Sequence, residues 1–389
     1  MFYKVSAATL LLSLLAGCSG NTADSVESDA QLTRAKQLLG QQLYFDTSLS
    51  KNRTQACSTC HDPQSGFVDG RDNGVNGAVS LGDDGHSLGD RTAPSAAYAM
   101  FSPEFHMNKD GKWVGGQFWD GRANTLADQA AGPPTNPIEM GMASKEETAQ
   151  RLKENPEYIK QFEAIYGAEI LNDAELAYKA MAESIGEFEK TEYFAPFDSK
   201  YDRFLRGEYQ LTKQEELGRT LFFSQQFTNC NQCHQLKTSL RADGETFTNY
   251  QYHNIGVPAN NALRKVNGVG VDTVDPGLLN NPLVTADKEK GKYKVPTLRN
   301  VAVTGPYMHN GVFQDLRTVV LFYDKYNSRA SRRQINPETG IAWRAPEVES
   351  TLSLKELEHG PALDDKRVNA LVAFLETLTD KRYEHLLEK

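Results

Sequence analysis

The sequence predicts an all-α protein in which two domains of one kind follow each other along the chain. Its 389 residues suffice for two domains, each with its own core. The pentapeptide Cys-x-x-Cys-His occurs twice, at residues 57–61 and 230–234. The long segments between and after these pentapeptides show helical spacing of apolar residues. A repeated motif on a helical background indicates a tandem duplication.

A similar segment precedes each pentapeptide. Residues 38–46 read LLGQQLYFD, and residues 216–224 read ELGRTLFFS. Both contain the pattern Leu-Gly-x-x-Leu-aromatic-Phe, which is typical of a short amphipathic helix. The duplication therefore includes a helix as well as the pentapeptide.

Three further helical segments are predicted. Residues 144–167 begin with Ser144 as N-cap and Glu147 at the third helical position, as in a capping box. Residues 173–193 carry another helical stripe. Residues 364–380 follow an Asp-rich first turn and place four apolar residues at helical spacing: Val368, Leu371, Val372 and Leu375.

The composition fits a soluble globular protein, with 39% hydrophobic and 24% charged residues. The net charge of −9 argues against nucleic acid as a partner.

The N-terminus predicts export. Residues 1–17 contain an apolar run that is too short to span a bilayer. The sequence LAGC at 15–18 resembles the lipobox of bacterial lipoprotein signal peptides, and a plain signal peptide that contains a cysteine is the alternative. Residues 18–30 are small, polar and acidic, as in a flexible tether. We expect lipid on Cys18 and the domains in the periplasm. Since Ser19 follows, rather than aspartate, we expect anchoring to the outer membrane.

The cysteines indicate the cofactor. Of five cysteines, Cys18 belongs to the predicted lipobox and four belong to the pentapeptides: Cys57, Cys60, Cys230 and Cys233. Cys-x-x-Cys-His attaches c-type haem, because the thiols bond to the vinyl groups and the imidazole coordinates the iron. A zinc site would need a fourth ligand, and a thioredoxin-like redox pair needs no histidine. Two covalent haems are therefore predicted, with no mature cysteine left for a disulfide.

Together these motifs resemble the di-haem cytochrome c peroxidase/MauG family of bacterial periplasmic proteins. The resemblance covers residues 31–380 and rests on both haem motifs and on the segments 117–140 and 294–327. It implies two cytochrome c-like haem domains in tandem, at residues 31–200 and 201–389. In this family the first haem meets hydrogen peroxide and the second transfers electrons. The proximal ligands would be His61 for the first haem and His234 for the second.

The resemblance also assigns catalytic roles. Glu139 matches the family's distal glutamate, and Gln129 and Pro133 match an amide and a proline of the same pocket. Trp119 matches the tryptophan that mediates electron exchange between the haems. Without the resemblance, these residues would be interpreted as a surface glutamate, a polar helix face and a buried tryptophan.

A calcium ion between the domains is implied as well. Its ligands would be the carbonyls of Thr304 and Pro306 and the side chain of Thr92, where the family usually has asparagine. A hydroxyl is a poorer calcium ligand than an amide oxygen. His309 matches a family histidine near a haem edge, and a structural histidine is the alternative.

The sixth ligand of the second haem divides the family. Peroxidases that take electrons from a small cytochrome usually have methionine there, and MauG-like members have tyrosine. The position is occupied by Tyr323, and Met308 is the alternative ligand. A thioether raises the haem potential, whereas an anionic phenolate favours ferric and higher oxidation states. For the first haem we expect an open distal side, with His86 as a weaker ligand candidate.

The leading hypothesis is a periplasmic enzyme that reduces hydrogen peroxide, with high-valent iron at the first haem and electrons that arrive through the second. The electrons would come from a cytochrome or a cupredoxin. One alternative is MauG-like oxidation of side chains on a partner protein. A pure electron-transfer cytochrome is another, but such a carrier needs no distal carboxylate. A homodimer is expected because peroxidases of this family often dimerise.

Overall fold

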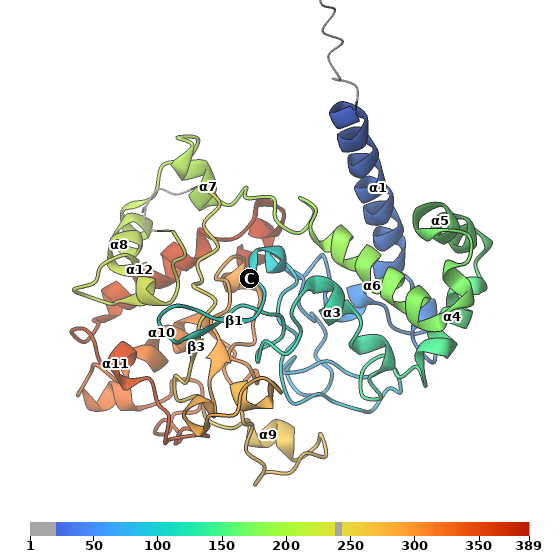
Figure 1. Cartoon of the computed structure of the whole chain (residues 1–389). Coiled ribbons are helices and arrows are strands. Elements are labelled where there is room, and N and C mark those ends of the chain that lie inside the picture. Colours follow the sequence, from blue (N-terminus) through green and yellow to red (C-terminus); the bar gives the residue numbers. More distant parts are fainter. Residues whose placement is uncertain (1–20, 238–242, 389) are drawn as a thin grey trace, which may run out of the picture.

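The computed structural model describes residues 21–237 and 243–388 and is mostly helical (Figure 1). The predicted signal peptide and Cys18 lie outside the described residues. The helices are α1 (Asn21–Tyr44), α2 (Cys57–Cys60), α3 (Leu126–Ala130), α4 (Lys145–Lys153), α5 (Pro156–Tyr166), α6 (Ala174–Glu189), α7 (Lys200–Leu205), α8 (Lys213–Phe222), α9 (Asn261–Arg264), α10 (Leu316–Asp324), α11 (Leu354–Leu357) and α12 (Asp365–Glu376). The strands are β1 (His106–Met107), β2 (Trp113–Val114), β3 (Tyr252–His253) and β4 (Tyr293–Lys294).

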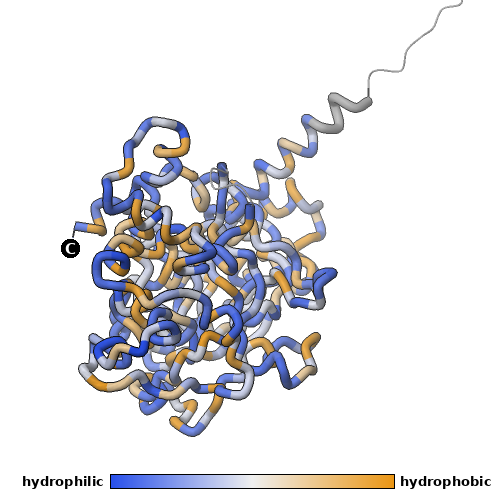
Figure 2. The backbone as a smooth tube through the Cα atoms, turned by 90° about the vertical axis from the view of Figure 1, so that its left-hand side faces the viewer, coloured by the Kyte–Doolittle hydropathy of each residue, from blue (hydrophilic) through white to orange (hydrophobic). Residues whose placement is uncertain are grey.

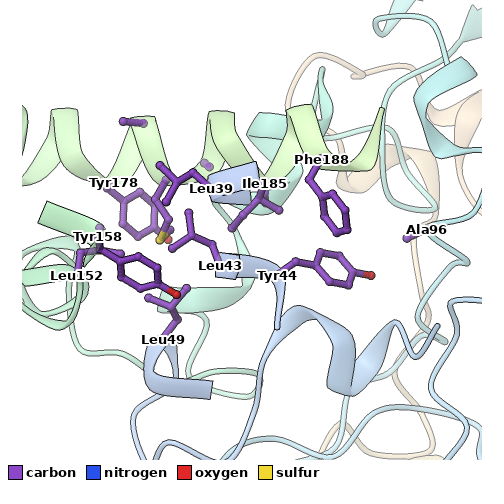
Figure 3. Packing of buried hydrophobic residues seen from close by; sticks show 14 of the residues in the cluster. Leu39, Leu43, Tyr44, Leu49, Ala96, Leu152, Tyr158, Tyr178, Ile185 and Phe188 are labelled. Atoms are coloured by element: carbon purple, nitrogen blue, oxygen red, sulfur yellow. The ribbon is translucent and has the colours of Figure 1, made fainter. Parts of the chain in front are cut away.

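The N-terminal half is built around the contact between α1 and α6. Leu39, Leu43 and Tyr44 of α1 are buried in a cluster with Ile185 and Phe188 of α6 (Figure 3). The helices approach closely at the glycine of the repeated motif. A Cβ atom at position 40 would lie 1.8 Å from the Ser184 carbonyl oxygen, so the contact admits only glycine.

The C-terminal half repeats this arrangement. Here α8 packs against α12, and a Cβ atom at Gly218 would lie 1.8 Å from the Ala370 carbonyl oxygen. Leu221, Phe222 and Phe374 are buried in a second cluster, which is separate from the first. The repeated Leu-Gly-x-x-Leu segment therefore marks the same helix–helix contact in both halves.

The all-α expectation omits two short antiparallel ladders. Strand β1 pairs with β2, and β3 pairs with β4. An isolated bridge between Val114 and Gln251 links the two ladders, and thereby the two halves of the chain. Each strand has two residues, which is too short for the alternating pattern that reveals a strand in a sequence.

Several local predictions need adjustment. The segment 144–167 forms two helices, because Pro156 starts α5 at the N1 position. Ser144 caps α4 by accepting a hydrogen bond from the Glu147 N–H at 3.2 Å. The Glu147 carboxylate, however, accepts from the Ala143 N–H at 2.8 Å, which is one residue earlier than a capping box requires.

The start of α1 also differs from expectation. Residues 21–30 are helical rather than the flexible coil predicted for the tether. Residues 27–34 are exposed, and Figures 1 and 2 show α1 projecting from the body of the protein. Composition gave no signal for the helical backbone of this segment. No helix within residues 21–237 and 243–388 is long and apolar enough to cross a membrane.

Polar contacts join the two halves. The Arg91 guanidinium lies 2.6 Å from the Asp275 carboxylate and 2.7 Å from that of Asp120. The Tyr98 hydroxyl donates to Asp380 at 2.6 Å. These buried contacts hold the two halves around the cavities described below.

Candidate active site

The first pentapeptide forms one helical turn, α2, followed directly by His61. The His61 Nδ1–H donates to the Phe67 carbonyl oxygen at 3.3 Å, which leaves Nε2 as the free coordinating nitrogen. Burial lowers the pKa of His61, so the imidazole is neutral, as a metal ligand must be. The side chains of Cys57, Cys60 and His61 line a cavity of about 1250 Å³, called here the first haem cavity.

The second pentapeptide has the same local geometry. The His234 Nδ1–H donates to the Phe247 carbonyl oxygen at 3.2 Å, and burial lowers the pKa of His234 to about 4. Phe67 and Phe247 both have left-handed backbone angles, with φ of 59° and 55°. Cys230, Cys233 and His234 line a cavity of about 1620 Å³, called here the second haem cavity.

These features fit covalent haem better than the alternatives. The four pentapeptide cysteines form no disulfide. A zinc site needs four ligands, whereas each pentapeptide offers three. Each motif instead presents two thiols and one neutral imidazole to a large cavity.

The predicted distal residues meet in the first haem cavity. Glu139, Gln129 and Pro133 all line it together with His61. Gln129 belongs to α3, which Thr125 caps by accepting from the Asp128 N–H. Burial raises the pKa of Glu139 above its usual 4.5, although a hydrogen bond from Asn136 opposes this shift. A buried carboxyl group with a raised pKa is suited to exchanging protons with a ligand in the cavity.

Trp119 lies between the two cavities. Its side chain lines both haem cavities, and its indole Nε1–H donates to the Thr92 carbonyl oxygen at 3.0 Å. The ring is therefore fixed at the wall that separates the cavities.

Known proteins resemble this chain over most of its length. The family profile described as di-haem cytochrome c peroxidase matches residues 34–210. The methylamine utilization protein MauG of Paracoccus denitrificans is 53% identical over 351 residues, which cover 90% of each chain. The chain belongs to the di-haem cytochrome c peroxidase/MauG family.

Two more comparisons agree. The cytochrome c peroxidase Ccp of Escherichia coli is 35% identical over 288 residues, which cover 73% of this chain and 51% of that protein. The crystal structure of the di-haem peroxidase BthA from Burkholderia thailandensis has a TM-score of 0.78 and 31% identity, and the match covers 90% of this chain and 86% of that chain. The protein is therefore a di-haem peroxidase, an oxidoreductase that uses hydrogen peroxide and binds two c-type haems.

Both candidates for the sixth ligand of this di-haem peroxidase line the second haem cavity. Tyr323 is on α10, and Met308 lies on the loop before it. Burial raises the pKa of Tyr323. No hydrogen bond to the Tyr323 hydroxyl is found among the described residues, so the oxygen is free for another partner. The Met308 carbonyl accepts a hydrogen bond from the Thr92 hydroxyl at 3.3 Å.

The predicted calcium ligands also come together. Thr92, Thr304 and Pro306 line a third cavity of about 1130 Å³, which also borders Trp119. The Thr92 hydroxyl can donate to the Met308 carbonyl at 3.3 Å or the His309 carbonyl at 3.5 Å, and either bond leaves its oxygen lone pairs available. An ion here would depend on carbonyl and hydroxyl oxygens, which calcium accepts.

The two other histidines named above have different environments. His309 is 4% exposed, stacks on Tyr293 with ring centroids 3.6 Å apart, and lines the second haem cavity. Its Nε2 has no partner among the described residues, which is consistent with a contact to the haem edge. The His86 side chain is 79% exposed, pairs with Asp84 at 3.2 Å, and is not among the residues that line the first haem cavity.

Sequence reasoning missed three cavity residues. Glu189, 5% exposed, lines the first haem cavity with an unpartnered Oε2, and burial raises its pKa to about 8. His253 lines the second haem cavity with an unpartnered Nε2. Lys294 lines the second and third cavities. Glu189 and His253 lie outside the segments that carry the family resemblance, and Lys294 begins one of them without a predicted role. Only the packing brings all three to the cavities.

Proposed function

We propose that this di-haem peroxidase reduces hydrogen peroxide in the first haem cavity, with Glu139 as the acid–base group and Trp119 as the electron path from the second haem. The observation that carries the proposal is the meeting of Glu139 and Gln129 with His61 in one cavity. The presence of Trp119 in the walls of both haem cavities supports the electron path.

Glu139 has the properties that peroxide cleavage needs. Heterolysis requires a group that removes a proton from one peroxide oxygen and returns it to the departing oxygen, and a carboxyl group can do both. The raised pKa of Glu139 brings its protonated and ionised forms closer in free energy near neutral pH. The Gln129 amide can orient the peroxide by hydrogen bonding. The haems, when bound, supply the redox chemistry.

We assign Tyr323 as the sixth ligand of the second haem. It lines that cavity near Cys230 and Cys233, and its hydroxyl has no described hydrogen bond. Burial disfavours the phenolate, so its ionisation depends on the positive charge of a bound metal.

A second candidate function is the peroxide-dependent oxidation of side chains on a partner protein. The 53% identity to MauG favours this function, and so does the position of Tyr323. In that case the partner protein, rather than a cytochrome or a cupredoxin, supplies the electrons.

We further propose one calcium ion held by Thr92, Thr304 and Pro306, supported by their shared cavity. Metal analysis of purified protein should find one calcium ion per chain, and Thr92→Asn should bind it more tightly because an amide oxygen is the better ligand. Protein that retains full activity with no calcium would contradict this site.

The domain division, cellular location and oligomeric state of the enzyme are also proposals. Two cytochrome c-like domains, at residues 31–200 and 201–389, are supported by the separate buried clusters. The sequence of residues 1–18 supports a periplasmic protein held to the outer membrane by lipid on Cys18. The family resemblance supports a homodimer.

Optical spectroscopy tests the function. The enzyme should show one high-spin and one low-spin haem, and the high-spin signal should change on adding peroxide. Turnover should then be compared with a reduced cytochrome, a reduced cupredoxin and candidate partner proteins as electron sources. Two low-spin haems that do not respond to peroxide would instead indicate a pure electron carrier.

A further inference from the structure

A second hollow adjoins the first haem cavity. It is partly open to solvent and is lined by Phe118, Arg122, Ala123, Asp128, Gly132, Asn136 and Glu139. Three of these residues, Phe118, Arg122 and Glu139, also line the first haem cavity. This hollow, called here the outer pocket, therefore meets the haem cavity at the carboxyl group proposed to handle protons.

The wall between the outer pocket and the haem cavity is held in place by charged contacts. The Arg122 guanidinium lies 3.7 Å from the centroid of the Phe118 ring. Its Nη1 also contacts the Asp120 carboxylate at 2.9 and 3.0 Å. Asp120 is fully buried and pairs with Arg91 at 2.7 Å. The aromatic ring is thus fixed through a chain of ion pairs rather than free to swing.

The backbone of Phe118 supports a specific role for this ring. Its φ is +63°, in the left-handed region that a bulky residue rarely adopts. Such conformations persist where the surrounding structure enforces them, and they concentrate at functional sites.

Gly132 lines the outer pocket beside the Phe118 ring. The residue is exposed and has ordinary helical angles, φ −81° and ψ −62°, so its backbone does not require glycine. A Cβ atom there would lie 3.6 Å from Phe118 Cζ and 3.3 Å from the Gln129 carbonyl oxygen. A longer side chain would therefore extend toward the Phe118 ring and narrow the outer pocket.

We propose that the outer pocket is the route by which hydrogen peroxide reaches the first haem cavity, and that Phe118 and Gly132 set its width so that larger hydroperoxides are excluded. Hydrogen peroxide is small and neutral and can exchange hydrogen bonds with Asn136 and Glu139 along the way. An organic hydroperoxide would have to pass its hydrocarbon group through the outer pocket alongside Phe118 and Gly132.

The test uses haem-loaded protein and two opposite changes. Gly132→Leu should fill the route, and Phe118→Ala should widen it. Glu163→Leu is the matched control, because Glu163 lies on the exposed face of α5 and lines none of the cavities described above. Stopped-flow absorbance would give the second-order rate constants for hydrogen peroxide, for cumene hydroperoxide and for cyanide binding.

Gly132→Leu should lower the rate constants for both hydrogen peroxide and cyanide by at least about tenfold, since both ligands must pass the same opening. Its resting spectrum should not change, and Glu163→Leu should match the wild type. Phe118→Ala should raise the rate ratio of cumene hydroperoxide to hydrogen peroxide by a similar factor. Unchanged rate constants in a correctly loaded Gly132→Leu protein would overturn the proposal.

If Gly132→Leu fails to bind two haems, the test depends on Phe118→Ala alone. An unchanged ratio of its rate constants for cumene hydroperoxide and hydrogen peroxide would refute the route. The inference rests on the proposed reaction site in the first haem cavity. Cyanide separates the two ideas, because it binds without peroxide cleavage. If a variant has a lower rate constant for hydrogen peroxide but an unchanged rate constant for cyanide binding, its catalysis is impaired and its access route is intact. That result in Gly132→Leu would count against the proposed route.

Discussion

Replacing Glu139 with glutamine should slow the reaction with hydrogen peroxide while leaving the cavity intact. The amide has nearly the same shape as the carboxyl group, so the first haem cavity, which Gln129 and Pro133 also line, should keep its shape. What disappears is the ability to accept a proton and to give it back. Removal of one acid–base group typically costs about 10²–10⁴ in rate, which is about 3–5.5 kcal/mol in activation free energy.

The pH profile provides a second, independent readout. Because burial raises the pKa of Glu139 above 4.5, the wild-type carboxylate is lost at a higher pH than an ordinary glutamate would require. The rate with peroxide should therefore fall as pH drops through this raised pKa. Glutamine does not titrate, so the Glu139→Gln profile should lack this inflection.

Stopped-flow spectroscopy of the diferric protein would follow both effects. The cyanide association rate serves as the control, since cyanide reaches the same cavity without peroxide cleavage, and it should change by no more than a few fold. Glu139→Gln protein that forms the oxidised species at the wild-type rate, or that keeps the same pH inflection, would show that Glu139 is not the proton shuttle.

Tyr323→Met should raise the potential of the second haem. After stoichiometric peroxide, Mössbauer spectra of the wild type should show both irons oxidised above the ferric state, and spectra of the variant should not. A wild type that reacts only after prior reduction would refute the Tyr323 assignment. Gly218→Ala should lower the free energy of unfolding by about 1–3 kcal/mol, because its Cβ would lie 1.8 Å from the Ala370 oxygen. Denaturant titration would measure this, with Gly89→Ala, whose nearest contact would be 3.7 Å, as the control; equal losses would refute the packing argument. Cys18→Ala should move the protein from the membrane fraction to the soluble periplasmic fraction of native cells, and soluble wild type would contradict lipidation.

Local motifs carried much of the prediction. Each Cys-x-x-Cys-His stretch holds both thiols and the imidazole within five consecutive residues, so its chemistry needs no tertiary information. The repeated Leu-Gly-x-x-Leu segment also predicted a helix, since its apolar residues recur at helical spacing. The structure then supplied the reason for its glycine, which is the carbonyl oxygen of a partner helix 1.8 Å from the missing Cβ.

The rest depended on tertiary contacts between distant parts of the chain. A sequence has no signal for the burial of Glu189 or for the contact of the Thr92 hydroxyl with Met308, 216 positions away. The position of Trp119 between two cavities was implied only by the family resemblance. Arg122 and Gly132 look like ordinary surface residues until folding places them beside Phe118. Covalent and helical features are encoded by neighbours in sequence, whereas cavity walls, pKa shifts and access routes arise only when separate segments pack together and exclude water.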